Sequence, residues 1–527
     1  MKKILLTLGT ALMLCLSSYS QQVPGTQASI HLGSQNYVKN NMMPSQIVGS
    51  DDQGIYITKV SLKDELRNIH DFPVLERYSK QMELSQFREL KVTSTDHPAQ
   101  FERIIELGDN LYCFYSTLER GTKTKVLLAQ RVNKTTLSLE NEVLTIQSLS
   151  YDGPAYDSPS FNIKSSTDGS MLLVSHILPD PNSKNELLSF QVLDRHLNTQ
   201  WAIDYTSELE HGHCLLENYH LSPKGDVYVL TKHVEKNGDL EKFWEPNYHY
   251  QILAIQNQGK KTKTFSPEIK GKFLTKMQIA TNLENELVCA GLYQDEKASN
   301  SVGSYFMTLD SSDKLPKQIS FKEFDPVTVA SESNKKISRQ EKQLGIFAYN
   351  LTDMVMRNDG GAILIAEQAT MMASNSPRSA THSSKVSYNN IAVISIDPDG
   401  QVMWTEEIQK NQIAVGGYNS FSSYATAVMH DKVYLVFNDN PENLCNGVCE
   451  PVLFNPKAPQ KDVLVALVEL DWNGKIKKEA LSLSQNINIL TKPSACKQVS
   501  KNEMVVLGQY NKEYRLARLE FEQTFSY

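Results

Sequence analysis

The stretch IAVISIDPDGQVMW, residues 391–404, contains two runs of β-forming residues on either side of the turn DPDG. Asp, Pro and Gly favour a tight turn, so the stretch predicts two short strands joined by a hairpin. Asp397 ends the first run, where its carboxylate can accept hydrogen bonds from N–H groups of the turn. We assign Asp397 this local role rather than a catalytic one.

The same hairpin recurs along the chain. SFQVLDRHLNTQWAI, residues 189–203, carries Asp194 and Trp201 at the corresponding positions, and VALVELDWNGKIKKEAL, residues 465–481, carries Asp471 and Gly474. Weaker versions surround Asp310 and Glu76. Repetition at long, regular intervals indicates a fold built from copies of one unit.

Another hairpin precedes each of these hairpins along the chain. In it, a turn rich in Asp, Asn and Gly is followed by a β-rich run. These runs begin at residues 55, 111, 171, 227, 287, 362, 433 and 504, so they are 56 to 75 residues apart. A further short run precedes each turn, as FERIIEL does at residues 101–107. The unit is therefore four short antiparallel strands, and eight units in a row predict a β-propeller.

The fold class predicted is all-β: a β-propeller of eight four-stranded blades, with seven as the alternative, and residues 21–527 form one domain. The last unit lacks a fourth strand, and ASIHLG at residues 28–33 has no partner in the first unit. We expect this N-terminal strand to close the ring, because an open sheet edge is a liability. The units lie near residues 47–92, 101–148, 159–207, 216–266, 275–323, 350–410, 420–485 and 495–527 plus 26–34.

The first 20 residues, MKKILLTLGTALMLCLSSYS, predict a secretory signal peptide cleaved after Ser20. Two lysines precede an apolar run that is too short to cross a bilayer, and small residues precede the cleavage point. The later chain has no apolar run of 18 residues, so we expect no transmembrane segment. We expect an exported protein that is periplasmic or associated with the outer membrane. The net charge of −7 argues against nucleic acid as a partner.

Signals for chemistry are few. The segment EHGHC, residues 210–214, holds His211 and His213, whose imidazoles make them candidate metal ligands. DPDGQVMW shares Asp, Gly and Trp with the repeat of quinoprotein propellers, but a structural turn explains the pattern equally, and we expect no cofactor. Signatures of catalytic nucleophiles and phosphate loops are absent, so we assign no catalytic residue.

Cys445 and Cys449 lie four positions apart in FNDNPENLCNGVCEPVLFNP, residues 437–456. Two thiolates supply only half of a tetrahedral zinc site, and no further His or Cys lies in the segment to complete it. An exported chain meets oxidising conditions, which favours a Cys445–Cys449 disulfide. Metal binding and free thiols are the alternatives.

Residues 388–443 resemble a family of exported propeller-like proteins of uncharacterised function from Bacteroidetes. The resemblance rests on WTEEIQKNQ from Trp404, GGYNSFSSYATAV from Gly416 and VYLVFNDN from Val433. It implies the propeller fold and export, and it implies no mechanism. Within this region we expect a ligand-binding surface with these candidate residues: Asn438, Asp439, Asn440, Tyr418 and Tyr424.

Two functions follow from these features. The first is a non-enzymatic binding or scaffold module for a protein, peptide or glycan of the cell envelope, and its grounds are repeated blades without a catalytic motif. The second is a hydrolase or lyase that acts on a glycan with carboxylates at the mouth of the central channel. A channel mouth with several carboxylates and an Arg or His would favour the enzyme, and an aromatic-rich face would favour binding.

Overall fold

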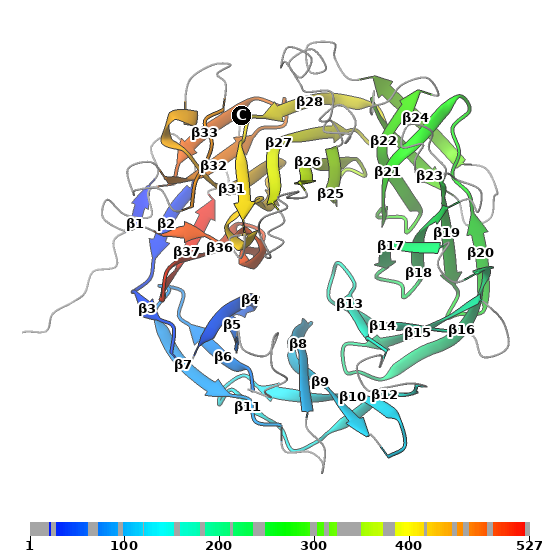
Figure 1. The fold of residues 1–527 in the computed structure, drawn as a ribbon, viewed down its shortest axis with the longest axis horizontal. Coiled ribbons are helices and arrows are strands. Elements are labelled where there is room, and N and C mark those ends of the chain that lie inside the picture. The colour runs from blue at the N-terminus through cyan, green and yellow to red at the C-terminus, as the bar shows by residue number, and fades with distance from the viewer. Residues whose placement is uncertain are drawn as a thin grey trace, which may run out of the picture.

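The computed structural model describes residues 20–22, 28–39, 41–61, 72–92, 99–119, 121–151, 159–179, 185–210, 214–234, 248–295, 303–309, 316–323, 349–372, 385–415, 419–444, 451–456, 463–481 and 489–521. Eight antiparallel sheets follow one another around a ring, each a blade of a β-propeller (Figure 1). The expected eight four-stranded blades are therefore confirmed, and the alternative of seven is not. No helix within the described ranges is long and apolar enough to span a membrane.

Each blade runs from an inner to an outer strand in chain order. Blade 1 contains β4 (Met42–Asp51), β5 (Gly54–Ser61), β6 (Val74–Tyr78) and β7 (Leu84–Glu89). Blade 2 contains β8 (Ala99–Leu107), β9 (Asn110–Glu119) and β10 (Thr124–Asn133), and both β11 (Ser138–Leu139) and β12 (Leu144–Ser150) pair with β10. Blade 3 contains β13 (Asn162–Ser165), β14 (Met171–Pro179), β15 (Asn185–Asp194) and β16 (Thr199–Glu210). Blade 4 contains β17 (Cys214–Leu221), β18 (Val227–Val234), β19 (Tyr248–Gln256) and β20 (Lys261–Phe265).

The second half of the ring repeats this order. Blade 5 contains β21 (Lys272–Thr281), β22 (Leu287–Asp295), β23 (Gly303–Leu309) and β24 (Pro316–Glu323). Blade 6 contains β25 (Tyr349–Met356), β26 (Ala362–Met372) and β27 (Lys385–Ile396), with β28 (Val402–Ile408) and β29 (Gln412–Val415) both on β27. Blade 7 contains β30 (Ala425–Met429), β31 (Lys432–Asp439), β32 (Leu464–Leu470) and β33 (Ile476–Ala480). Blade 8 contains β34 (Leu490–Thr491), β35 (Lys497–Gln498), β36 (Glu503–Tyr510) and β37 (Glu513–Phe521).

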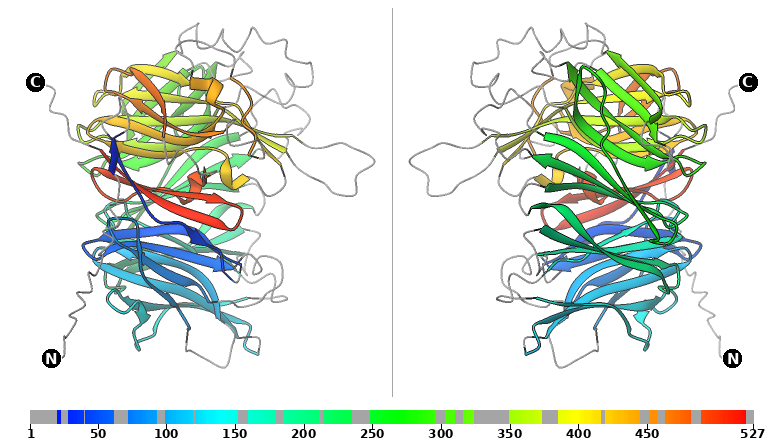
Figure 2. Two further views of the ribbon diagram at one scale, coloured as in Figure 1. Left: turned by 90° about the vertical axis from the view of Figure 1, so that its left-hand side faces the viewer. Right: turned by 90° about the vertical axis from the view of Figure 1, so that its right-hand side faces the viewer.

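An N-terminal strand completes blade 8, as the sequence predicts. β2 (Ala28–Leu32) pairs with β37 in a register that sets Ala28 opposite Phe521 and Leu32 opposite Ala517. β3 (Asn36–Tyr37) also pairs with β37, and β1 (Ser20–Gln22) lies outside β2. Figure 2 shows the ring edge-on, with red β37 between the blue strands of blade 1 and the orange strands of blade 7. The two ends of the chain therefore hold the ring closed.

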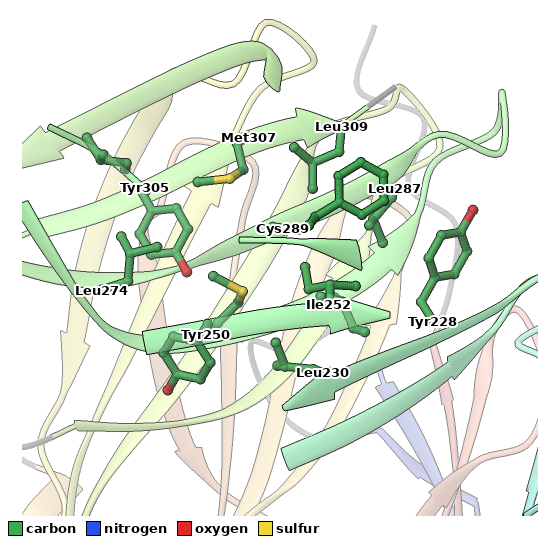
Figure 3. Close-up of a cluster of buried hydrophobic side chains, with 14 of the residues drawn as sticks. Tyr228, Leu230, Tyr250, Ile252, Leu274, Leu287, Cys289, Tyr305, Met307 and Leu309 are labelled. Carbon is green, nitrogen blue, oxygen red and sulfur yellow. The ribbon is translucent and has the colours of Figure 1, made fainter. Parts of the chain in front are cut away.

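Apolar cores lie between successive blades. The cluster in Figure 3 joins Leu230 on β18 and Ile252 on β19 to Cys289 on β22 and Met307 on β23, all with exposed fractions of zero. Middle strands contact a neighbouring blade on both sides, which explains why β5, β9 and β31 are buried almost throughout. Burial on both faces also explains why these strands read as apolar runs rather than as an alternating pattern.

The turn carboxylates act as the sequence predicts. Asp194 accepts hydrogen bonds from the N–H groups of His196 (2.8 Å) and Asn198 (2.9 Å). Asp397 accepts one from the N–H of Gln401 (2.7 Å), and Asp471 accepts two in its own turn. Turns of this kind, and those between first and second strands, lie on one face of the ring. We call it the turn face, and the opposite face the loop face.

Tryptophans dock one blade onto the next. The indole N–H of Trp201 on β16 donates to the carbonyl of Gly225 in blade 4 (3.0 Å). The indole N–H of Trp404 on β28 donates to the carbonyl of Trp472 in blade 7 (2.9 Å). In both pairs an outer strand contacts the turn of the following blade.

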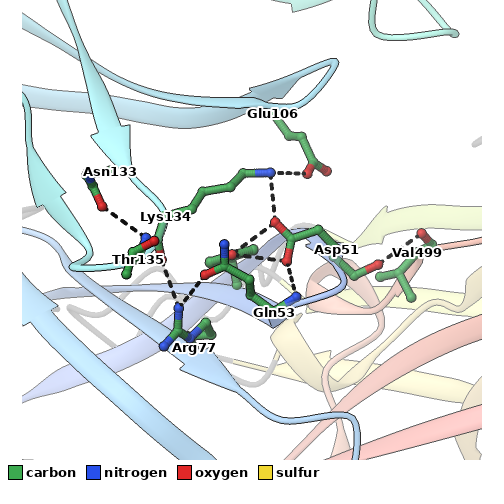
Figure 4. A network of polar contacts seen from close by, with 10 residues as sticks. Asp51, Gln53, Arg77, Glu106, Asn133, Lys134, Thr135 and Val499 are labelled. Atoms are coloured by element: carbon green, nitrogen blue, oxygen red, sulfur yellow. Dashed lines mark hydrogen bonds and ion pairs between the residues drawn. The ribbon is translucent and has the colours of Figure 1, made fainter.

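Polar side chains join blades 8, 1 and 2 where the ring closes (Figure 4). Lys134 of blade 2 forms ion pairs with Asp51 of blade 1 (2.9 Å) and Glu106 of blade 2 (3.5 Å). Arg77 of blade 1 donates to the carbonyl of Lys134 (2.8 Å), and the hydroxyl of Ser50 donates to a carbonyl of blade 8. We assign this network a structural role in holding the blades together, because its charged groups pair with one another within the protein.

Candidate functional site

β25, the inner strand of blade 6, separates two cavities. One, the side cavity, lies between blades 6 and 7 and has a volume of approximately 440 Å³. The other, the channel cavity, is approximately 890 Å³ and is lined by the inner strands of blades 3 to 6. Both are lined by Asp353 and Val355 to Asn358. Their volumes fall in the range of about 300–1,000 Å³ that is typical of small-ligand sites.

The side cavity opens at the turn face and has an aromatic rim. Trp472, in the turn between β32 and β33, is 65% exposed, and Trp404 lies beside it. The hydrogen bond from the indole of Trp404 to the carbonyl of Trp472 orients the pair. Gly474 makes this approach possible, because a Cβ at its position would lie 2.8 Å from the Trp404 ring.

Polar groups converge on the same cavity. Arg357 donates to the hydroxyl of Ser395 (3.1 Å) and to the carboxylate of Asp359 (2.6 Å). His430 stands in the turn of blade 7 at a positive φ of 51°. Its Nδ1 is buried and has no hydrogen-bond partner among the described residues. The cavity thus offers a guanidinium, an imidazole nitrogen and the carboxyl of Asp353 next to indole rings.

A hydrogen-bonded belt forms the wall of the channel cavity. Lys164 on β13 donates to the side chain of Asn218 on β17 (3.1 Å) and to the carbonyl of Tyr219. Asn218 donates to Gln278 on β21 (2.7 Å), and Gln278 donates to the carbonyl of Leu351 on β25 (3.3 Å). Inner strands of four successive blades are therefore held in register by side chains that also face the cavity.

Burial sets the charge of this wall. Desolvation, together with the nearby Lys164, lowers the pKa of His220 to about 4, so the imidazole is neutral at pH 7. His220 shares a hydrogen bond with the hydroxyl of Thr281 (3.0 Å). Desolvation also lowers the pKa of Lys164 and raises the pKa of Asp353, and the charge of Glu367 adds to the rise at Asp353. The wall of the channel cavity thus combines side-chain amides with a neutral imidazole.

The candidates from the sequence fall into two groups. Tyr424 is buried behind the side cavity, where its hydroxyl contacts Thr352 and donates to Asp353 (3.3 Å). Asn438 and Asp439 lie instead at the loop-face end of β31 and have no exposed surface. Asn440 follows them and is half-buried. Of the candidates whose side chains the structure describes, only Tyr424 contacts a cavity residue, Asp353.

Asn438 and Asp439 have their polar atoms matched within the protein. The amide of Asn438 donates to the carbonyls of Phe421 (2.7 Å) and Thr491 (2.8 Å). Asp439 pairs with Lys478 (2.7 Å) and accepts from Asn443 (2.6 Å). Their role as ligand contacts stays a prediction. The following candidates lie outside the described residues: Tyr418, His211, His213, Cys445 and Cys449.

Sequence reasoning missed Asp353, Arg357 and Trp472 as cavity residues. Asp353 lies on β25 and Arg357 directly follows the end of that strand, so both become candidates once β25 is known to be an inner strand. Trp472 directly follows the turn carboxylate Asp471, and the presence of a tryptophan within a turn was the available sequence signal. Among the side chains that the structure describes, no group of three or more His, Cys, Asp or Glu could hold a metal ion.

Comparison with known proteins identifies no family. No protein-family model and no curated protein matches the sequence. Among solved structures, the chain is similar to the WD40 domain of SCAP from fission yeast, with 8% identity over 96% of this chain and 98% of that one, and a TM-score of 0.38. It is also similar to the β-propeller domain of the Trilobed protease from Pyrococcus furiosus, with 10% identity over 82% and 95% and a TM-score of 0.34.

A third similar structure is an apocarotenoid oxygenase from Synechocystis, with 9% identity over 90% of this chain and 88% of that one, and a TM-score of 0.32. Values this low carry no argument about ligand or activity. The propeller assignment rests on the strand pairing of this chain itself.

Proposed function

We propose that this protein is a binding module whose ligand occupies the side cavity between blades 6 and 7. The observation that carries the proposal is the exposed indole of Trp472 beside Trp404 and Arg357 at the mouth of a preformed cavity. Exposed tryptophans and arginines are the residues that most often dominate binding energy. An aromatic rim is also the feature that favours binding over catalysis.

The ligand class that fits is a segment of a glycan or a peptide. Indole faces stack on the apolar face of a sugar or on an aliphatic side chain, and Arg357 and the amides of the channel cavity supply directional hydrogen bonds. The adjoining channel cavity gives such a chain room to continue along the inner wall.

The test compares two exposed aromatic residues. Trp472→Ala removes the rim, whereas Phe87→Ala on β7 removes a side chain of nearly equal exposure, 66%, on the outer strand of another blade. A glycan array and a pull-down from envelope extract identify the ligand with the unmodified protein. We expect Trp472→Ala to weaken binding by roughly tenfold or more and Phe87→Ala to leave it unchanged. Equal effects of both variants would remove the proposal.

A second function, a hydrolase or lyase acting on a glycan, is supported by Asp353. This carboxyl faces both cavities and has a raised pKa, as a general acid requires, with Arg357 and His430 nearby. Turnover of an array ligand that is lost in Asp353→Asn, while binding is kept, would replace the binding proposal. Binding without turnover would support the binding proposal and contradict the hydrolase or lyase.

We further propose that the protein is exported to the periplasm or the outer-membrane surface. The proposal is supported by the N-terminal sequence and by the resemblance to exported propeller-like proteins. N-terminal sequencing of the mature chain from fractionated cells tests it. We expect Gln21 as the first residue, and an intact Met1 in the cytoplasmic fraction would contradict export.

A further inference from the structure

The hydrogen bonds in the wall of the channel cavity run in one direction from blade to blade. Lys164 on β13 donates to Oδ1 of Asn218 on β17 (3.1 Å), and Nδ2 of Asn218 donates to Oε1 of Gln278 on β21 (2.7 Å). Nε2 of Gln278 donates to the carbonyl of Leu351 on β25 (3.3 Å). An ammonium group can only donate and a carbonyl can only accept, so the two ends of the series determine how both amides are oriented.

Each of these three side chains keeps an N–H group for a ligand. The ammonium of Lys164 has three hydrogens, and the structure describes two acceptors for them, Asn218 and the carbonyl of Tyr219. The amide groups of Asn218 and Gln278 have two hydrogens each, and the structure describes one acceptor for each group. All three side chains line the channel cavity. Three adjacent inner strands therefore offer one spare donor each, counted against the acceptors that the structure describes.

The charge of Lys164 has no carboxylate beside it within the described part of the chain. Lys164 is half-buried, and burial lowers its pKa without an opposing effect from a negative charge. Burial also lowers the pKa of Lys497, but there the charge of Glu106 opposes the shift. Lys492 has no opposing carboxylate either, but it lines neither cavity. A cation that is partly removed from water is stabilised by a bound anion.

Other charged side chains of the channel cavity have partners outside it. Arg357 pairs with Asp359 (2.6 Å). Glu217 lies near two lysines of blades 4 and 5: burial lowers the pKa values of Lys232 and Lys276, and the charge of Glu217 opposes both shifts. The unmatched charge in the wall is therefore positive and lies at Lys164.

A carboxylate fits this wall in charge and in hydrogen bonding. Its two oxygens accept about four hydrogen bonds, and its single charge matches that of Lys164. A phosphate monoester carries a charge of about −1.5 to −2 at pH 7, so part of its charge would stay unmatched. Burial and the charge of Glu367 raise the pKa of Asp353, which disfavours a competing negative charge in the same cavity.

The surroundings of the donors favour a sugar as the carrier of the carboxylate. His220 and Thr281 share a hydrogen bond (3.0 Å) and line the same cavity, where they can contact hydroxyl groups. Leu283, in the turn between β21 and β22, is 72% exposed at the edge of the cavity and can cover the apolar face of a sugar ring. A sugar acid combines a carboxylate, hydroxyl groups and an apolar ring face in one rigid unit.

We propose that the channel cavity binds the carboxylate of an acidic glycan, a chain that contains uronic-acid sugars, with Lys164, Asn218 and Gln278 as the contacts. The inference rests on the proposed function, because it assigns the acidic part of the same ligand to the channel cavity. The side cavity supplies the stacking contact at Trp472, and the channel cavity selects for negative charge.

The experiment uses the mature chain, residues 21–527, and matched pairs of tetrasaccharides. Oligomers of galacturonate, glucuronate and mannuronate are each compared with their methyl esters, which keep the hydroxyl groups but carry no charge. We expect at least one acid to bind roughly tenfold or more tightly than its ester in calorimetry. A glutamate-containing heptapeptide and its glutamine counterpart form a second arm, and a preference for this peptide over every uronate would contradict a glycan ligand.

Variants of buried lysines assign the preference to the cavity. Lys164→Met removes the charge at similar side-chain length and should bind acid and ester equally. Lys164→Arg keeps the charge and should keep the preference for the acid. Lys492→Met is the matched control, because it removes a lysine that also lacks an opposing carboxylate but lies outside both cavities. Circular dichroism and thermal melting confirm that each variant is folded.

Two results would overturn the inference. The first is that the unmodified protein binds no uronate more tightly than its ester, a measurement that needs no variant. The second is an unchanged preference for the acid in Lys164→Met. Trp472→Ala separates this inference from the proposed function. If it weakens acid and ester alike while Lys164→Met changes neither, the side cavity stands and the channel site fails. The reverse pattern would support the channel site and contradict the side cavity.

Discussion

Burial makes the ionisation of His220 a stability determinant. Its ring is 7% exposed on the inner wall of blade 4, and its pKa of about 4 lies below the ordinary value of 6.5. The unfolded chain therefore binds a proton at a higher pH than the folded chain does. The stabilising contribution is present above pH 6.5 and is lost as the pH falls from 6.5 towards 4.

His220→Gln is expected to reduce this pH dependence. The amide can still contact Thr281, but it does not titrate. Between pH 6.5 and pH 4 the free energy of unfolding should fall by up to about 3 kcal/mol more in the original protein than in the variant. Urea denaturation at several pH values measures the difference. Parallel curves for the two proteins would contradict the assignment, and His196→Gln, at an exposed position, serves as the control.

A second residue-scale prediction concerns the buried ion pair behind β29. Lys410 has an exposed fraction of zero and lies 2.7 Å from Glu367, which is 2% exposed. Lys410→Met leaves the carboxylate buried without its cation, so we expect a loss of about 3–5 kcal/mol in the free energy of unfolding.

Two further variants make the test of Lys410 specific. Adding Glu367→Gln to Lys410→Met removes the unpaired charge and should recover part of the loss. Lys91→Met breaks an exposed pair with Glu89 and should cost less than about 1 kcal/mol. If the double variant were no more stable than Lys410→Met, unpaired charge would not be the cause.

At the scale of elements, the turn between β32 and β33 combines a backbone requirement with a packing requirement. Gly474 has a φ of +83°, which side-chain-bearing residues rarely adopt, and its α-carbon faces the Trp404 ring. Gly271 has a similar φ of +73°, but a Cβ added to it would meet no atom within 4 Å. Comparing substitutions at the two glycines therefore separates the free-energy cost of the positive φ from the free-energy cost of the contact with Trp404.

Gly474→Ala is expected to destabilise the fold by roughly 1 kcal/mol or more beyond Gly271→Ala, because it also displaces the indole of Trp404. Urea denaturation gives the two free energies, and Trp fluorescence should change only in Gly474→Ala. Equal losses in both variants would mean that the Trp404 contact contributes nothing.

The elements were predictable because their signals are local. Turn carboxylates such as Asp397 and Asp471 act within four residues, so the sequence alone locates the hairpins. Asn438 and Asp439 are buried for a non-local reason. They end β31, but residues 419–421, 441–444 and 490–491 cover them, and sequence order does not reveal which segments pack there.

At the scale of the molecule, ring closure could be predicted from the sequence, whereas the cavities could not. A cavity wall such as Lys164–Asn218–Gln278 joins residues more than 50 positions apart, and no periodic signal marks it. Closure is different, because the last unit lacks a fourth strand and the N-terminal strand has no partner in the first unit. The two observations together predict that the N-terminal strand pairs with the last unit. Once both ends belong to one sheet, stability of the whole ring depends on a strand of five residues.

We therefore expect that removing β2 opens the ring. Ala28 and Ile30 are 0% and 3% exposed and pack with Met504 and Leu519 in the core of blades 7 and 8. A chain of residues 34–527 should melt at a lower temperature than residues 21–527, and amides of β37 should lose protection from hydrogen exchange. Ile30→Ala should cost roughly 2–5 kcal/mol by itself. Tyr37→Ala, at a 54% exposed position on β3, is the control. Unchanged melting and unchanged exchange in β37 after the truncation would show that blade 8 is stable without its N-terminal strand.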